Sequence, residues 1–135
     1  MRLRASSSID ATPEQVWSVL TNTAAWPDWD SGFTNVDGRL ALGEKLSITV
    51  KANSGRVFPV KVVTLNGPER IVFRGGMPLG LFTGQRTYTL LPEGTGTRFT
   101  MREEYTGLAA MIFKSIPDLG PPFRQFAEGL KHQAE

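Results

Sequence analysis

The first residues of the chain alternate between polar and apolar side chains. Arginines and serines between residues 2 and 9 alternate with apolar or small side chains, namely Leu3, Ala5, Ser7 and Ile9. A repeat of two residues is typical of a β-strand with one buried face. A helix is predicted to follow, because Thr12 can cap it, Pro13 suits its first position and Gln15 can complete a capping box. A second short helical turn reaches Trp26, and Pro27 ends it.

The middle of the chain is a series of short strands separated by Gly, Pro and Asn signals. The predicted strands cover residues 32–36, 44–51, 56–65, 70–74, 82–91 and 97–105. Residues 92–96 join the last two of these, and their glycines can take the positive φ that a tight hairpin needs. These two strands are therefore predicted to be antiparallel neighbours.

From Leu108 to Leu130 the apolar positions return at helical spacing. Prolines and a glycine between residues 117 and 122 predict a kink, with the longest straight part of the helix after it. The resulting order is one strand, two short helices, six strands and a long helix. It predicts an α+β fold in which a curved antiparallel sheet of about seven strands surrounds the C-terminal helix. A length of 135 residues predicts a single domain over residues 1–135.

Composition and charge exclude several kinds of function. Fifteen Lys and Arg oppose thirteen Asp and Glu, and no basic run interleaved with aromatic residues predicts nucleic-acid binding. The chain has no Cys, and its one histidine, His132, lies in a polar tail, so we expect neither a metal site nor histidine catalysis. The glycines at residues 75–76 and 94–96 lack the context of a phosphate loop, so no cofactor is expected. Without a signal peptide or spanning segment, the prediction is a cytoplasmic protein with no integral membrane association.

The hairpin of residues 82–105 carries the most informative candidate residues. Pairing Leu90 with Thr97 places one set of side chains on a single face, namely Arg86, Tyr88, Leu90, Phe99, Met101, Glu103 and Tyr105. Phe99 and Met101 identify this face as the apolar one, which places Arg86 and Glu103 inside, within diagonal reach of each other. Three interpretations remain open for this pair: an ion pair with no ligand role, orientation of a ligand, and acid-base catalysis by Glu103.

Two other segments allow more than one interpretation. Three tryptophans occur close together, at residues 17, 26 and 29, and either plug one end of the sheet or form a wall on which a ligand stacks. The glycine-rich segment of residues 74–82 is either a plain hairpin loop or a lid over the mouth of a cavity.

Four segments resemble the START-like (SRPBCC) superfamily, and in particular its branch of small polyketide cyclase/dehydrase-like proteins. They are IDATPEQVWSVLTNTAAWPDWD, VDGRLALGEKLSI, QRTYTLLPEGTGTRFTMREEYTG and FRQFAEGLKHQAE, in this order along nearly the whole chain. The resemblance implies a helix-grip fold with a cavity for lipids, polyketides or other hydrophobic molecules. Members of the superfamily include carriers, hormone receptors, cyclases and chaperone activators, so the fold alone does not select a function.

The leading hypothesis is a binder or carrier of a small hydrophobic molecule, without catalysis. Arg86, Glu103 and Tyr105 would orient the ligand, and an apolar wall would be formed by Phe58, Val60, Phe73, Tyr88, Phe99, Met101, Trp29, Phe123 and Phe126. The alternative enzyme would be a cyclase or dehydratase that uses Glu103 or Tyr105 for proton transfer. A third possibility is a chaperone-activator-like interaction module, which basic residues of the outer face disfavour (Lys61, Arg74, Arg98 and Arg102). The protein is expected to be a monomer or homodimer.

Overall fold

The computed structural model describes residues 2–51, 53–77, 82–106 and 120–135. The described strands are β1 (Arg2–Ile9), β2 (Phe33–Asp37), β3 (Lys45–Val50), β4 (Asn53–Asn66), β5 (Arg70–Met77), β6 (Phe82–Glu93) and β7 (Gly96–Thr106). The helices are α1 (Pro13–Thr21), the 3-10 helix η1 (Thr23–Asp28) and α2 (Gly120–Ala134). The predicted part of the C-terminal helix before residue 120 lies mainly outside the described residues, as does the centre of the predicted loop or lid at 78–81.

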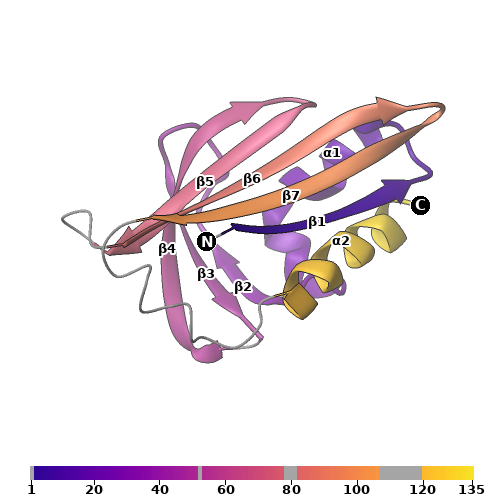
Figure 1. The fold of residues 1–135 in the computed structure, drawn as a ribbon. Helices are drawn as coiled ribbons and strands as arrows, with labels where there is room; N and C mark the ends of the chain where they lie inside the picture. Colours follow the sequence, from indigo (N-terminus) through magenta and orange to yellow (C-terminus); the bar gives the residue numbers. More distant parts are fainter. Residues whose placement is uncertain (1, 52, 78–81, 107–119) are drawn as a thin grey trace.

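The seven strands form one antiparallel sheet in the order β1-β7-β6-β5-β4-β3-β2. The first strand of the chain pairs with the last, and every other neighbour in the sheet is also a neighbour in sequence. The sheet curls around α2, while α1 and η1 cover one end of the molecule (Figure 1). This arrangement confirms the predicted α+β helix-grip fold, including the two short helices after the first strand. We call the sheet face toward α2 the inner face and the opposite one the outer face.

The start of α1 has the predicted capping box. The Thr12 hydroxyl accepts a hydrogen bond from the backbone N–H of Gln15 at 3.2 Å, and the Gln15 side chain accepts one from the backbone N–H of Thr12 at 2.9 Å. Pro13 occupies the first turn, where no helical donor is needed. The helix therefore begins where local chemistry alone places it.

The register of the β6–β7 hairpin corrects the sequence prediction. Leu90 pairs with Phe99 and not with Thr97, because the strands continue through Pro92 and Glu93 to a tighter turn. Gly94 supplies the positive φ of that turn, at 61°. The correction is two residues, and side chains alternate with a period of two, so the predicted set of inner-face residues is unchanged. Arg86 and Glu103 are directly opposite each other, where diagonal neighbours had been predicted.

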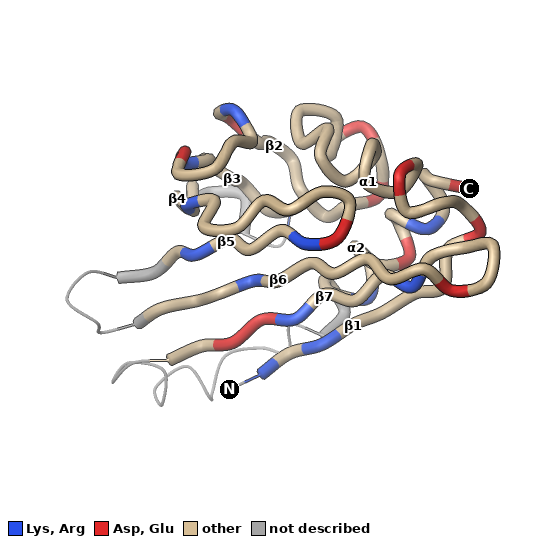
Figure 2. The backbone as a smooth tube through the Cα atoms, turned by 90° about the horizontal axis from the view of Figure 1, so that it is seen from above, with Lys and Arg blue, Asp and Glu red and all other residues tan. Residues whose placement is uncertain are grey.

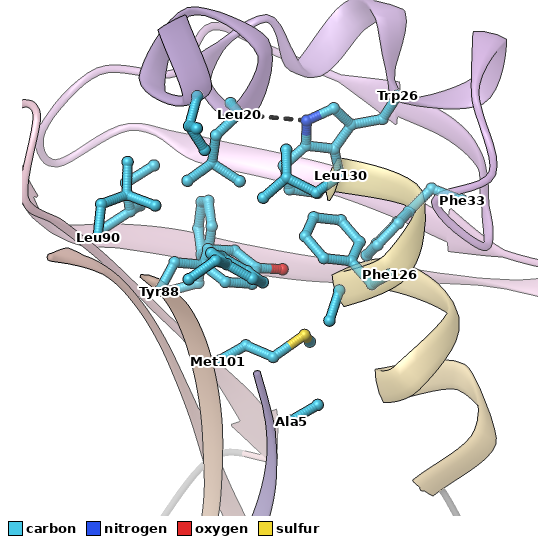
Figure 3. Packing of buried hydrophobic residues seen from close by; sticks show 14 of the residues in the cluster. Ala5, Leu20, Trp26, Phe33, Tyr88, Leu90, Met101, Phe126 and Leu130 are labelled. Atoms are coloured by element: carbon cyan, nitrogen blue, oxygen red, sulfur yellow. Dashed lines mark hydrogen bonds between the residues drawn. The ribbon is translucent and has the colours of Figure 1, made fainter. Parts of the chain in front are cut away.

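Aromatic rings fill the space between the inner face and α2. Phe126 of α2 lies 5.0 Å from the Trp26 ring and 5.2 Å from the Tyr88 ring, measured between centroids (Figure 3). The Trp26 indole N–H donates to the Leu20 carbonyl at 3.1 Å, so this buried donor is satisfied. Trp26 is thus a core residue, which agrees with the interpretation that the tryptophans plug one end of the sheet. Trp17 and Trp29 are only partly buried and pack against the edge of this cluster.

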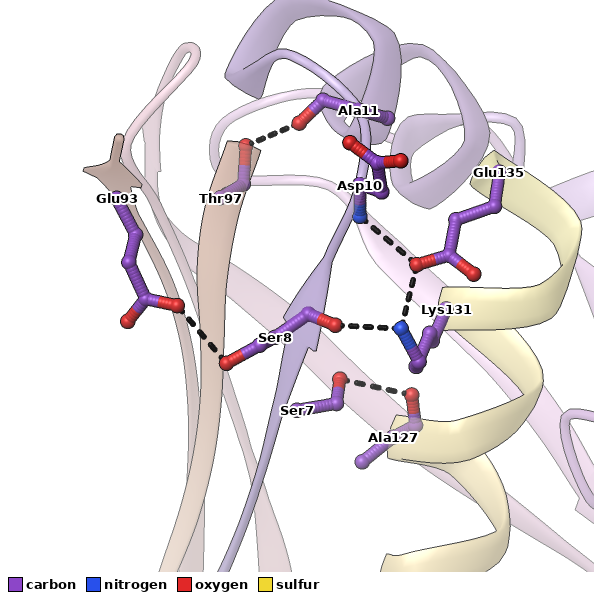
Figure 4. Close-up of polar contacts among 9 residues, drawn as sticks. All are labelled: Ser7, Ser8, Asp10, Ala11, Glu93, Thr97, Ala127, Lys131 and Glu135. Carbon is purple, nitrogen blue, oxygen red and sulfur yellow. Dashed lines mark hydrogen bonds and ion pairs between the residues drawn. The ribbon is translucent and has the colours of Figure 1, made fainter. Parts of the chain in front are cut away.

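Polar contacts join α2 to β1 along one line (Figure 4). The Ser7 hydroxyl donates to the Ala127 carbonyl at 3.0 Å, and the Lys131 ammonium donates to the Ser8 carbonyl at 2.7 Å. The Glu135 carboxylate accepts a hydrogen bond from the backbone N–H of Asp10 at 2.8 Å. Together these contacts fix the position of the helix over the sheet edge.

Candidate functional site

An ion pair between neighbouring strands is the main polar feature of the inner face. Arg86 of β6 and Glu103 of β7 are directly opposite in the register. The Nε and Nη2 atoms of Arg86 both donate to Oε2 of Glu103, at 2.9 Å and 2.6 Å. The two side chains are only 22% and 12% exposed. A charged pair so far from water requires close geometry, because the lost hydration of both ions must be offset.

Aromatic side chains surround this ion pair. The guanidinium carbon of Arg86 lies 4.9 Å from the centre of the Phe123 ring, which is a cation-π contact with the first turn of α2. Phe73 of β5 is opposite Arg86 on the other side. The pair therefore borders the aromatic core and is in contact with both layers of the fold.

The ionisation of neighbouring groups reflects this environment. Burial is the largest single effect on the pKa of Arg86 and lowers it, but the charges and hydrogen bonds of Glu103 and Tyr88 together outweigh burial, so the net direction is upward and Arg86 stays cationic. Burial raises the pKa of Tyr88, against the opposing effect of Arg86. The pKa of Tyr105 is also raised, first by burial and then by the charge of Glu103. Both tyrosines are neutral hydrogen-bonding groups at physiological pH.

Two glycines are paired across neighbouring strands beside the ion pair. Gly84 of β6 is opposite Gly75 of β5 on one side and opposite Tyr105 of β7 on the other. A side-chain carbon added at Gly84 would come within 3.4 Å of the Tyr105 ring and 3.5 Å of Oε1 of Glu103. Glycine inside a strand often marks a place where a ligand or another backbone approaches closely. Gly75 fits the second case, because an added carbon there would come within 2.8 Å of the Pro59 carbonyl oxygen, whereas the position of an added carbon at Gly84 is bordered by the Tyr105 ring and the Glu103 carboxylate.

Apolar side chains of β3 and β4 continue the inner face beyond the core. Leu46 pairs with Val60 and is 1% exposed, whereas the next inner-face pair, Ile48 with Phe58, is only partly buried, as are Val60 itself and Val50. The exposure of apolar surface thus increases along these strands. This edge and the ion pair have the composition of a ligand site, which is mostly apolar with a few placed polar groups.

The structure distributes the predicted site residues over three places. Arg86, Glu103, Tyr105 and Phe123 come together around the ion pair, with Phe73 beside them. The second group packs into the core at 0–1% exposure and consists of Tyr88, Phe99, Met101 and Phe126. The third lies at the margins, with Phe58 and Val60 on β4 and Trp29 against Phe126 at 5.3 Å between ring centroids.

Sequence reasoning missed Gly75, Gly84, Ile48 and Val50. The available signal was the position of the glycines inside strand-forming runs, which had been assigned to a loop in the case of Gly75. Ile48 and Val50 follow the alternation of β3 and could have been found from it.

Comparison with known proteins assigns the family. The model of the family described as polyketide cyclase/dehydrase and lipid transport matches residues 1–135. The chain belongs to this family. No curated protein matches it by sequence.

Solved structures of low sequence identity share the fold. A Mesorhizobium loti protein is 19% identical with a TM-score of 0.76, over 98% of this chain and 95% of that one. A Rhodobacter sphaeroides protein is 22% identical with a TM-score of 0.73, over 98% and 90% of the two chains. A point mutant of norcoclaurine synthase from Thalictrum flavum, in complex with a transition-state analogue, is 16% identical with a TM-score of 0.74, over 99% and 93%.

The described residues contain no cluster of three or more His, Asp and Glu side chains that could hold a metal ion. Among the same residues, no helix is long and apolar enough to cross a membrane.

Proposed function

We propose that the protein binds a small, mostly apolar molecule on the inner face, with the polar end of that molecule at Arg86, Glu103 and Tyr105. The observation that supports this most is a nearly buried ion pair next to Gly84, a strand position without a side chain that the Glu103 carboxylate and the Tyr105 ring border. A pair with a purely structural role is often no more stabilising than apolar side chains of the same volume. Its position beside Gly84 and the partly buried apolar side chains of β3 and β4 favours a role in orienting a ligand.

The chemistry of the pair indicates which ligand group fits. The Arg86 guanidinium carries five N–H donors, more than its two contacts with Glu103 and its hydrogen bond with Tyr88 use. A carbonyl or hydroxyl oxygen is the complementary acceptor, and Tyr105 adds a neutral hydroxyl on the same side. The apolar part of the ligand would extend over Ile48, Val50 and Val60. Lipids, polyketides and aromatic ketones all combine these two parts.

The proposal is tested by filling the space at Gly84. Gly84→Leu places a branched side chain against Tyr105 and Glu103, while Thr83→Leu adds a similar side chain to the outer face of the same strand. Binding of the neutral probe N-phenyl-1-naphthylamine is followed by fluorescence, and native mass spectrometry of fresh protein detects any co-purified molecule.

The two substitutions should differ. Probe affinity and any co-purified mass should decrease about tenfold or more in Gly84→Leu, because a leucine excludes ligand atoms whose burial contributes about 1.5–3 kcal/mol. Thr83→Leu should bind like the wild type. If both variants bind the probe equally well while circular dichroism shows both folded, the inner face is not the binding site.

A second candidate function, cyclisation with loss of water, is favoured by one observation. The position of a side-chain carbon added at Gly84 lies 3.4 Å from the Tyr105 ring and 3.5 Å from Oε1 of Glu103, so a phenol and a carboxylate border the same place. The measurement is the mass change of a synthetic tetraketide thioester, which loses one water on aldol cyclisation and dehydration. Turnover that is lost in Glu103→Gln, while the probe still binds, would establish catalysis. Turnover unchanged in that variant would remove Glu103 from the mechanism.

A further inference from the structure

The outer face of the sheet places two arginines directly against each other. Arg4 of β1 and Arg102 of β7 are register partners, and the next strand contributes Thr87 opposite Arg102. Figure 2 shows basic residues on both β1 and β7 where the two strands run side by side. Like charges directly opposite each other in an antiparallel pair are destabilising. This pairing is therefore unfavourable for the sheet alone, and an anion bound between the two arginines would offset its cost.

In the described part of the chain, neither Arg4 nor Arg102 has an ion-pair partner, and neither does Arg70 of β5. The other carboxylates on this face are already engaged. Glu104 lies 3.6 Å from Arg2, and Glu93 lies 2.6 Å from Arg98.

The unpaired arginines line one hollow with hydroxyl groups between them. The hollow measures about 390 Å³ and its lining includes Arg4, Arg70 and Arg102 together with Thr87, Thr89 and Thr100. Thr100 is opposite Thr89, and Thr89 is opposite Arg70, so the hydroxyls form a row between the two groups of arginines. Arg98 and Glu104 also line it, and contribute one cation and one carboxylate at its margin.

We propose that this outer-face hollow binds a phosphate group, carried either by a small soluble ester or by a lipid headgroup. Arginine is suited to phosphate because its planar fork of donors matches two phosphate oxygens, and threonine hydroxyls donate to the remaining ones. The volume is that of a small-molecule site. The hollow is separated from the ion pair of Arg86 and Glu103 by the thickness of the sheet, so the two sites are distinct.

The test compares a double variant with a charge-matched control. Arg4→Gln with Arg102→Gln removes the opposed pair, and Arg39→Gln with Arg124→Gln removes two exposed charges that do not line the hollow. Isothermal titration with inorganic pyrophosphate at low salt measures the soluble source. Co-sedimentation with phosphatidylglycerol vesicles, against phosphatidylcholine vesicles, measures the headgroup source. Amide chemical shifts of Thr87, Thr89 and Thr100 locate the binding.

Pyrophosphate or anionic vesicles should bind the wild type. The Arg4/Arg102 variant should bind at least about tenfold more weakly, because it lacks two donors of charge-assisted hydrogen bonds to the phosphate. The control variant should stay within about twofold of the wild type if the effect is local and not that of net charge. Binding of pyrophosphate alone identifies a soluble phosphate, and binding of vesicles alone identifies a headgroup. Absence of both, or equal binding by the two double variants, would overturn the proposal.

Discussion

The Arg86–Glu103 ion pair gives a prediction whose magnitude follows from its burial. Arg86→Met keeps the length of the side chain but leaves the Glu103 carboxylate without its cation, at 12% side-chain exposure. Breaking a fully buried pair costs about 3–5 kcal/mol, because one ion remains desolvated and uncompensated. Both groups here retain some contact with water, so we expect a loss near the lower limit, about 3 kcal/mol of unfolding free energy.

The reciprocal and double substitutions separate pairing from side-chain loss. Glu103→Gln removes the carboxylate charge and should cost about 2 kcal/mol, because a buried guanidinium remains unpaired. The double variant contains neither charge and should also lose about 3 kcal/mol, where additivity would predict about 5. The resulting coupling of about 2 kcal/mol is the contribution of the pair itself.

Urea denaturation of the wild type, the two single variants and the double variant is followed by tryptophan fluorescence. The coupling is calculated from the changes in unfolding midpoint at constant slope. The exposed pair of Arg98 and Glu93 is the matched control, because its contact is also 2.6 Å but its side chains are 45% and 43% exposed. Its double-mutant cycle should show no resolvable coupling. Additive losses at Arg86 and Glu103 would show that burial does not strengthen the inner pair, and would refute the reasoning.

Three further predictions concern other contacts. Gly129→Ala should destabilise the protein although alanine favours helices, because the added carbon collides with the Asp30 carbonyl, and thermal unfolding would show a lower midpoint. Tyr88 and Tyr105 are the two tyrosines of the chain, and the pKa of each is raised, so tyrosinate absorbance at 295 nm should be absent from the folded protein at pH 10 and appear once it is denatured. The same shifts make stability decrease as pH rises through the ordinary tyrosine pKa of about 10. Hydrogen bonds lower the pKa of Glu135. The stability that its carboxylate contributes is therefore present above the ordinary glutamate pKa and is lost as the pH falls below that value. Glu135→Gln should accordingly make the free energy of unfolding depend less on pH in the acid range.

Local patterns predicted most of the fold because local chemistry decides it. The capping box at Thr12 and the alternation in β1, β6 and β7 each depend on residues close in sequence. The register of the β6–β7 hairpin was two residues out, because the turn has two residues and the sequence allows several lengths. Face assignment was insensitive to this error, so Arg86 and Glu103 were placed correctly on the inner face.

Long-range pairing accounts for what the sequence did not reveal. Arg4 and Arg102 oppose each other only because β1 joins the far end of the chain in the sheet, and no local signal specifies that partner. The pairing of Gly84 with Gly75 likewise joins residues of different strands. Such features become visible only when the register is known.

Alternation along β7 makes the two proposed sites separable by experiment. Arg102 and Glu103 are consecutive, yet Arg102 is exposed on the outer face and Glu103 is buried on the inner one. Substituting Arg102 should change phosphate binding and leave binding of a neutral apolar probe unaffected, while Gly84→Leu should do the opposite. If one substitution weakened both kinds of binding, the sheet itself would be deformed by the change, and neither site could be assigned from that variant. Reciprocal independence of the two readouts is therefore the result that the geometry of a single two-faced sheet requires.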